Sequence, residues 1–167
     1  YQDINNGNFF INPENGDVLI CDNDNVSPFG TNLGIMGKQR WMAPEIVMGK
    51  NDPDKNSDRF SLAVVLFRLL FINHPLEGRY STPPCMTKEA EQKYYGSAPI
   101  FVYDPSTTEN RPIPGTDHNL KLFWNVYPDY VKEAFIRAFS HDVMMKQKPR
   151  ILEKEWMDIF IRLRTEI

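Results

Sequence analysis

The sequence has few cysteines, no long uninterrupted apolar run and no excess of basic residues. Its two cysteines, Cys21 and Cys85, are too few for a disulfide framework. No cysteine–histidine cluster shows the spacing of zinc ligands. This cysteine usage fits a reducing compartment, and we expect a cytoplasmic protein. The formal net charge of −3 offers no basic face for phosphates, so nucleic acid is not an expected partner.

The longest apolar run, "SLAVVLFRLLFINHP" at 61–75, is interrupted by Arg68 and is too short to span a bilayer. It therefore predicts a buried helix, and no membrane insertion is expected. The sequence also lacks an initiating methionine and a charged-then-apolar leader. We expect it to be part of a longer protein.

A β-hairpin is the first element that the sequence predicts. Two apolar stretches, "NFFI" at 8–11 and "DVLI" at 17–20, flank "NPENGD", in which Asn15-Gly16 is a strong signal for a tight turn. The open end of this hairpin should lie near Asp3 and Asp22. Residues 23–42 are rich in Asn, Gly and Ser and predict a loop, and loops of this length are usually functional or mobile.

Helices are predicted for most of the remaining chain. Ser57 is a plausible N-cap for a helix whose apolar residues cover nearly all sides, as expected at the centre of a domain. Residues 97–117 are proline-rich and have no period, which predicts a long surface excursion. The stretches 127–139 and 152–164 have the pattern of amphipathic helices.

The order of several motifs resembles the C-terminal lobe of the protein-kinase fold. In that family a catalytic loop H-R-D-L-x-x-x-x-N is followed by D-F-G and then by A-P-E. Here Asp3 and Asn8 keep the five-residue step, Asp22 follows the hairpin, and "WMAPE" occupies 41–45. "SDRFSLAVVLF" at 57–67 is similar to the family's central helix, and "KPRILEKEW" at 148–156 to its late arginine motif.

The resemblance implies a mainly α (α+β) fold, a kinase C-terminal lobe with a short catalytic-loop hairpin and no N-terminal lobe. One domain is expected over 1–167. Its parts are the catalytic loop, hairpin and metal turn (1–24), the activation segment (25–45), the central helix (57–73), a long insertion (79–117) and the C-terminal helices (118–167). Within the family, "DINNGN", "CDND" and "HPLEG" are similar to bacterial eukaryotic-like Ser/Thr kinases with D-x-N-x-x-N and D-x-D motifs.

The resemblance also implies roles for residues at the catalytic end. Asp3 would orient the substrate hydroxyl and accept its proton, while Asn8 and Asp22 would hold Mg²⁺. Phe10 and Cys21 would line the adenine pocket of ATP. The residues alone leave other interpretations open: Phe10 as a core aromatic, Cys21 as a packed small residue, and Asp22 and Asp24 as solvated turn residues.

Three further residues would be structural if the family pattern applies. Glu45 and Arg150 would form a buried ion pair that ties the activation segment to the later helices. Asp58 would accept hydrogen bonds from catalytic-loop amides. The alternative for Asp58 is a first-turn acid favoured by the helix dipole.

The sequence departs from the family pattern at several positions. Gln2 replaces the arginine that usually pairs with a phosphorylated activation loop. Asn5 replaces a lysine that would screen the transferring phosphoryl group, so the rate could suffer. Asn23 and Asp24 replace the Phe and Gly of D-F-G, and Lys38 stands where Ser/Thr kinases usually carry a threonine. "RWMAPE" at 40–45 is similar to tyrosine kinases, so a tyrosine acceptor stays open, with Ser/Thr favoured by the broader subgroup resemblance.

These observations predict the catalytic and substrate-binding lobe of a protein kinase that uses ATP and Mg²⁺ to phosphorylate a protein Ser/Thr hydroxyl. No glycine-rich phosphate loop is present, so the isolated chain should be inactive, and an N-terminal lobe is an expected partner. One alternative is a pseudokinase scaffold, and another is a small-molecule phosphotransferase. The 79–117 segment is either a docking surface or a long connection.

Overall fold

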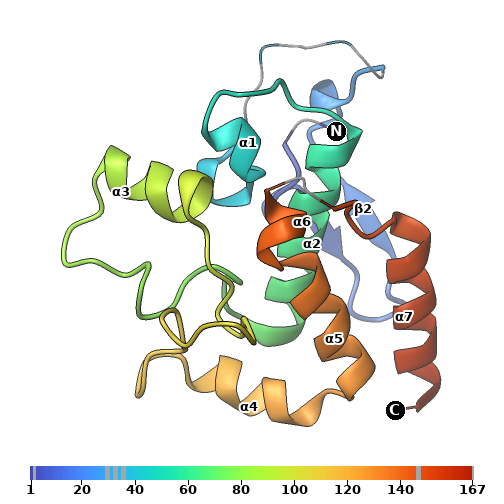
Figure 1. Ribbon diagram of the computed structural model, residues 1–167. Helices are drawn as coiled ribbons and strands as arrows, with labels where there is room; N and C mark the ends of the chain where they lie inside the picture. Colours follow the sequence, from blue (N-terminus) through green and yellow to red (C-terminus); the bar gives the residue numbers. More distant parts are fainter. Residues whose placement is uncertain (2, 29–30, 32–33, 35–36, 146–147, 167) are drawn as a thin grey trace.

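The computed structural model describes residues 1, 3–28, 31, 34, 37–145 and 148–166, without the side chain of Asn23. In this part of the chain, helices predominate and the strands form one antiparallel hairpin (Figure 1). The expected mainly helical fold with a small sheet is confirmed. No helix among the described residues is both long and apolar enough to cross a bilayer.

The elements follow one another in a simple order. The strands are β1 (Phe9–Ile11) and β2 (Val18–Ile20). Two 3-10 turns, Asn23–Asn25 and Gln39–Trp41, precede α1 (Pro44–Val47) and α2 (Lys55–Phe71). α3 (Lys88–Gln92) continues as a π-helical turn, Lys93–Ser97. The last helices are α4 (His118–Val126), α5 (Asp129–Ala138), α6 (His141–Met144) and α7 (Glu153–Glu166).

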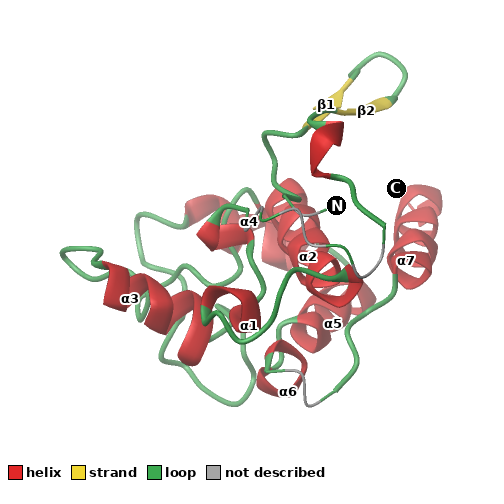
Figure 2. Cartoon of the chain, turned by 90° about the horizontal axis from the view of Figure 1, so that it is seen from above, coloured by secondary structure: helices red, strands yellow, loops and turns green. Residues whose placement is uncertain are grey.

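The predicted hairpin is present and stands away from the helical body (Figure 2). Phe10 pairs with Leu19 at its centre. The amide of Gly16 donates to the carbonyl of Asn12 at 2.8 Å, and Gly16 has a φ of +78°. This left-handed conformation explains why glycine follows Asn15 at the turn.

The central helix α2 begins earlier than predicted. Asp54, not Ser57, is its N-cap: the Asp54 carboxylate accepts from the Ser57 amide at 2.7 Å, and the Ser57 hydroxyl accepts from the Asp54 amide at 2.8 Å. Both residue types are good caps, and the reciprocal pair satisfies two amides at once. The predicted start was therefore wrong, because Ser57 serves as the third residue of a capping box.

Aromatic side chains form the centre of the core around α2, which packs against α4 and α5. The ring of Phe67 meets those of Phe101, Phe135 and Phe139 at centroid separations of 5.6, 5.3 and 6.0 Å. Each contact is close to edge-on, the arrangement that the ring quadrupoles favour. Phe101 comes from the proline-rich segment, so that segment takes part in the core.

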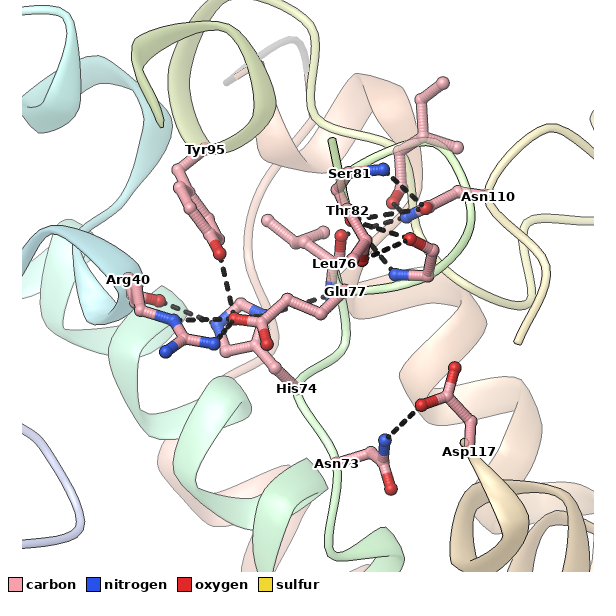
Figure 3. A network of polar contacts seen from close by, with 12 residues as sticks. Arg40, Asn73, His74, Leu76, Glu77, Ser81, Thr82, Tyr95, Asn110 and Asp117 are labelled. Carbon is pink, nitrogen blue, oxygen red and sulfur yellow. Dashed lines mark hydrogen bonds and ion pairs between the residues drawn. The ribbon is translucent and has the colours of Figure 1, made fainter. Parts of the chain in front are cut away.

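The interpretation of residues 97–117 as a surface excursion is thus wrong. Phe101 and Val102 are 1% and 0% exposed. The buried side chain of Asn110 donates to the Leu76 carbonyl at 2.9 Å (Figure 3). It also donates to the Ile100 carbonyl (2.7 Å) and accepts from the Tyr80 amide (3.1 Å). Such bonds satisfy buried backbone groups without a helix or sheet. The segment can therefore be buried although its sequence lacks the apolar periodicity of a helix or strand.

Candidate active site

The catalytic loop holds Asp3 through two asparagines. The Asn8 amide nitrogen donates to the Asp3 carbonyl at 2.9 Å and lies 3.4 Å from its Oδ2. The Asn5 amide nitrogen donates to the same carbonyl at 3.1 Å. Asp3 Oδ1 is buried and has no hydrogen-bond partner among the described residues. A buried acceptor without a donor is costly, so this oxygen is suited to receive a hydrogen bond from a bound molecule.

The hairpin returns the chain to this loop. The Cys21 amide donates to the Asn8 carbonyl at 2.9 Å, and the Tyr1 hydroxyl donates to the Cys21 carbonyl. Asp22 follows directly and has a φ of 60°, a conformation that few residues other than glycine adopt. Its Oδ2 accepts from the Asn25 side chain at 2.8 Å. Backbone strain of this kind concentrates at functional sites.

The carboxylates of Asp3 and Asp22 both lie close enough to Tyr1 to affect the pKa of its phenol. Burial raises the pKa of its phenol, and the negative charges of Asp22 and Asp3 raise it further. Asn8 acts in the opposite direction by hydrogen bonding. The structure therefore brings Asp3, Asn8 and Asp22 together around the aromatic residue that stands in the histidine position of the family motif.

The donor set suits magnesium bound together with phosphates. The described residues contain no group of three or more His, Cys, Asp or Glu side chains that could hold a metal alone. Asn8 and Asp22 supply an amide oxygen and a carboxylate, which are the hard oxygen ligands that Mg²⁺ prefers. Mg²⁺ usually takes few protein ligands and completes its shell with water and substrate phosphates. Asp22 and Asp24 are both exposed.

The two residues predicted to line the adenine pocket lie on or next to the hairpin. Phe10 is 59% exposed and its strand partner Leu19 is 64% exposed. Phe10 is therefore not a core aromatic in this structure. Cys21 is partly buried and has a free thiol.

Asp58 connects the central helix to the catalytic loop. The amino nitrogen of Tyr1 lies 3.0 Å from Asp58 Oδ2. Burial raises the pKa of Asp58, and the contact with the Tyr1 nitrogen opposes that rise. Asp58 also lies in the first turn of α2, so its role as an acceptor for catalytic-loop amides stays a prediction.

Glu45 and Arg150 form a bidentate ion pair across 105 residues of sequence. The two nitrogen–oxygen distances are 2.9 and 2.8 Å. Arg150 also donates to the carbonyl of Asn56 at 2.9 Å, and its guanidinium lies over the ring of Phe60. Both residues are buried, with exposures of 8% for Glu45 and 6% for Arg150. Loss of either partner would therefore leave the other charge buried without compensation.

Two polar side chains hold the end of the activation segment. The Ser61 hydroxyl donates to the Trp41 carbonyl at 2.8 Å. His74 Nε2 donates to the Arg40 carbonyl at 2.7 Å (Figure 3). The Leu76 amide donates to His74 Nδ1 at 3.1 Å, which assigns the neutral tautomer with its proton on Nε2. Burial lowers the pKa of His74 to about 4.

Sequence reasoning missed this anchor and the polar groups around it. Glu77 accepts hydrogen bonds from Arg40 Nε at 2.7 Å and from the Tyr95 hydroxyl at 2.8 Å (Figure 3). The signal in the sequence is "HPLEG" at 74–78, which by itself indicates a subgroup motif and not this anchor. Sequence reasoning also missed a contact between two residues that depart from the family pattern. Lys38 Nζ donates to Asn5 Oδ1 at 3.2 Å.

Some predicted features lie outside the described residues. They are Gln2, the side chain of Asn23 and residues 29–30, 32–33 and 35–36 of the activation segment.

The protein kinase domain family model matches residues 1–118, which is most of the chain. The chain belongs to the protein kinase domain family. A second comparison finds similarity to mitogen-activated protein kinase kinase kinase 3 of Arabidopsis thaliana, 32% identical over 72 residues. That alignment covers 41% of this chain and 12% of the plant kinase. The chain thus corresponds to a small part of this relative.

Proposed function

We propose that this chain is the catalytic and substrate-binding lobe of a protein kinase that transfers the γ-phosphate of ATP to a protein Ser/Thr hydroxyl. The observation that carries the proposal is the buried Asp3 Oδ1, which lacks a partner among the described residues while Asn8 and Asp22 lie close by. The D-x-N-x-x-N and D-x-D motifs favour a bacterial eukaryotic-like Ser/Thr kinase. An N-terminal lobe in the parent chain would complete the ATP site.

In the proposed reaction the substrate hydroxyl donates its hydrogen bond to Asp3. Its oxygen attacks the γ-phosphorus, the bond from that phosphorus to the bridging oxygen breaks, and ADP leaves with the electron pair. Asp3 takes the hydroxyl proton. Asn8 and Asp22 would hold Mg²⁺, which neutralises charge on the phosphates. Phe10 and Cys21 would line the adenine pocket.

A pseudokinase scaffold is the second candidate. The observation that favours it is Asn5, which is 0% exposed and hydrogen-bonded within the loop, at a position where the family usually has a lysine. A scaffold would need the fold but not the chemistry. Stabilisation by nucleotide separates the candidates, because a ligand that binds the native state raises its melting temperature.

The test is phosphate transfer from labelled ATP with Mg²⁺ by the full parent chain and by its Asp3→Asn variant. We expect incorporation by the parent, a fall of at least about 10²-fold in the variant, and equal melting temperatures for the two proteins. Background transfer by both folded proteins, with no thermal shift at saturating MgATP, would instead establish the scaffold. The isolated 167-residue chain is expected to show no transfer.

A further inference from the structure

Lys38 brings a positive charge to a catalytic loop that has none of its own. Residues 1–11 contain no lysine or arginine. Lys38, which lies 33 residues after Asn5, is an exposed residue, but its ammonium lies 3.2 Å from Oδ1 of the buried Asn5. Asn5 Nδ2 in turn donates to the backbone carbonyl of Asp3. The ammonium is therefore linked to Asp3 through a single side chain.

Asn5 is held rigidly enough to orient this ammonium. Its Oδ1 also accepts from the Gly7 amide at 2.9 Å, so both ends of the amide bond to the catalytic-loop backbone. Fixed hydrogen bonds of this kind reduce the freedom that a long lysine side chain must lose to act at one place. Asn5 thus positions Lys38 and does not itself replace the missing charge.

Gly7 provides the space for the contact. A Cβ at this position would lie 3.0 Å from Asn5 Oδ1 and 3.6 Å from Lys38 Nζ. Gly7 is not among the glycines with positive φ, so its backbone conformation does not require glycine. A Cβ would instead crowd Asn5 Oδ1, whereas its distance to Lys38 Nζ would be an ordinary van der Waals contact.

We propose that Lys38 is a catalytic residue whose ammonium contacts the γ-phosphoryl group during transfer. This inference rests on the proposed kinase function. A phosphoryl group in transit carries charge that a fixed cation stabilises. Lys38 keeps its proton throughout, because Asp3 takes the one released by the hydroxyl. The cation usually supplied from the catalytic loop is here supplied from the activation segment.

The first test compares Lys38→Met with the parent in the full chain, with Lys88→Met as a matched control on exposed α3. We expect kcat to fall about 10²–10³-fold for Lys38→Met and to stay unchanged for Lys88→Met. Lys38→Arg, which retains the charge, should recover part of the loss. A folded Lys38→Met protein with the parent's kcat would overturn the proposal.

A binding measurement distinguishes contact with phosphate from a purely structural tie. Calorimetry gives the affinities for MgADP and for Mg²⁺ with a non-hydrolysable ATP analogue. Removing the ammonium should reduce the preference for the analogue by about tenfold or more and leave ADP affinity unchanged. Equal losses for both nucleotides would mean that Lys38 only ties the segment to the loop. This readout applies even if parent and Asp3→Asn both fail to transfer phosphate, the outcome that would defeat the proposed function.

A double variant that moves the lysine from position 38 to position 5 provides the sharpest control. Lys38→Thr should lose activity as Lys38→Met does, and Lys38→Thr combined with Asn5→Lys should recover it because the charge returns to the loop. A folded double variant no more active than Lys38→Thr would count against the proposal. If the double variant does not fold, because Asn5 is buried, Lys38→Met and the nucleotide preference decide the question.

Discussion

At the scale of single residues, Asp22 combines a left-handed backbone conformation with the proposed role of holding Mg²⁺. Its φ of 60° lies in the left-handed region, which costs most residues other than glycine roughly 1 kcal/mol or more. Asparagine tolerates that region better than most residues and could still accept the bond from Asn25. The conformation should therefore survive a change from Asp to Asn.

We expect Asp22→Asn to leave the free energy of unfolding within about 0.5 kcal/mol of the parent. Phosphate transfer should nevertheless fall by at least about 10²-fold, because the amide binds Mg²⁺ more weakly than a carboxylate. Urea unfolding and a magnesium titration of activity check both parts. An unaffected magnesium requirement would show that Asp22 is a turn residue only.

At the scale of elements, the end of the activation segment depends on a buried neutral histidine. Protonation of His74 would give Nδ1 a hydrogen in place of the lone pair that accepts the Leu76 amide. The nearby Glu77 carboxylate, 3.7 Å from Nδ1, favours the charged form, but burial outweighs it and the pKa falls to about 4. The unfolded chain, with an ordinary histidine pKa of about 6.5, binds this proton more readily.

The sign of the pH effect follows from this difference. Stability contributed by neutral His74 is full above pH 6.5 and is lost progressively as the pH falls toward 4. Between pH 7 and pH 5 the parent should lose about 2 kcal/mol more than His74→Gln, which cannot titrate. Urea unfolding at the two pH values measures the difference. Parallel losses in both proteins would mean that His74 is not held neutral.

At the scale of the whole molecule, the Glu45–Arg150 pair joins the activation segment to the residues before α7. Removal of one partner leaves a buried charge, so Glu45→Ala and Arg150→Ala should each destabilise the domain by about 3–5 kcal/mol. The double variant should cost less than the sum, because neither charge remains.

The exposed ion pair between Arg162 and Glu166 is the matched control, with side chains that are 59% and 41% exposed. Its loss in Glu166→Ala should cost less than about 1 kcal/mol. Urea unfolding of all four variants supplies the comparison. Costs for Glu45→Ala and Arg150→Ala close to that of the control would mean that the buried pair has no structural role.

Features set by neighbouring residues were predictable from the sequence, whereas features set by distant contacts were not. The hairpin around Asn15-Gly16 was predictable, because turn chemistry and alternating apolar residues are local signals. The start of α2 was missed by three residues, since Asp54 and Ser57 are both good caps and only their reciprocal hydrogen bonds decide between them. The burial of Phe101 was missed because proline-rich segments show no period that would indicate a core.

The candidate site shows the same division. The spacing of Asp3, Asn8 and Asp22 could be recognised in the sequence because it follows a family pattern. The roles of these residues stay predictions. The contact of Lys38 with Asn5 was not predictable from the sequence, although both residues depart from that pattern. Nothing in the separation of 33 residues indicates that the two side chains meet.

By itself the sequence determined a mainly helical domain of the protein kinase family, with a catalytic-loop hairpin, because these follow from local signals and motif order. Only the tertiary structure decided that Lys38 reaches the catalytic loop, that His74 is buried and neutral, and that the 97–117 segment enters the core. The physical reason is that desolvation and long-range hydrogen bonds depend on which distant residues pack together. Those distances exist only once the chain has folded.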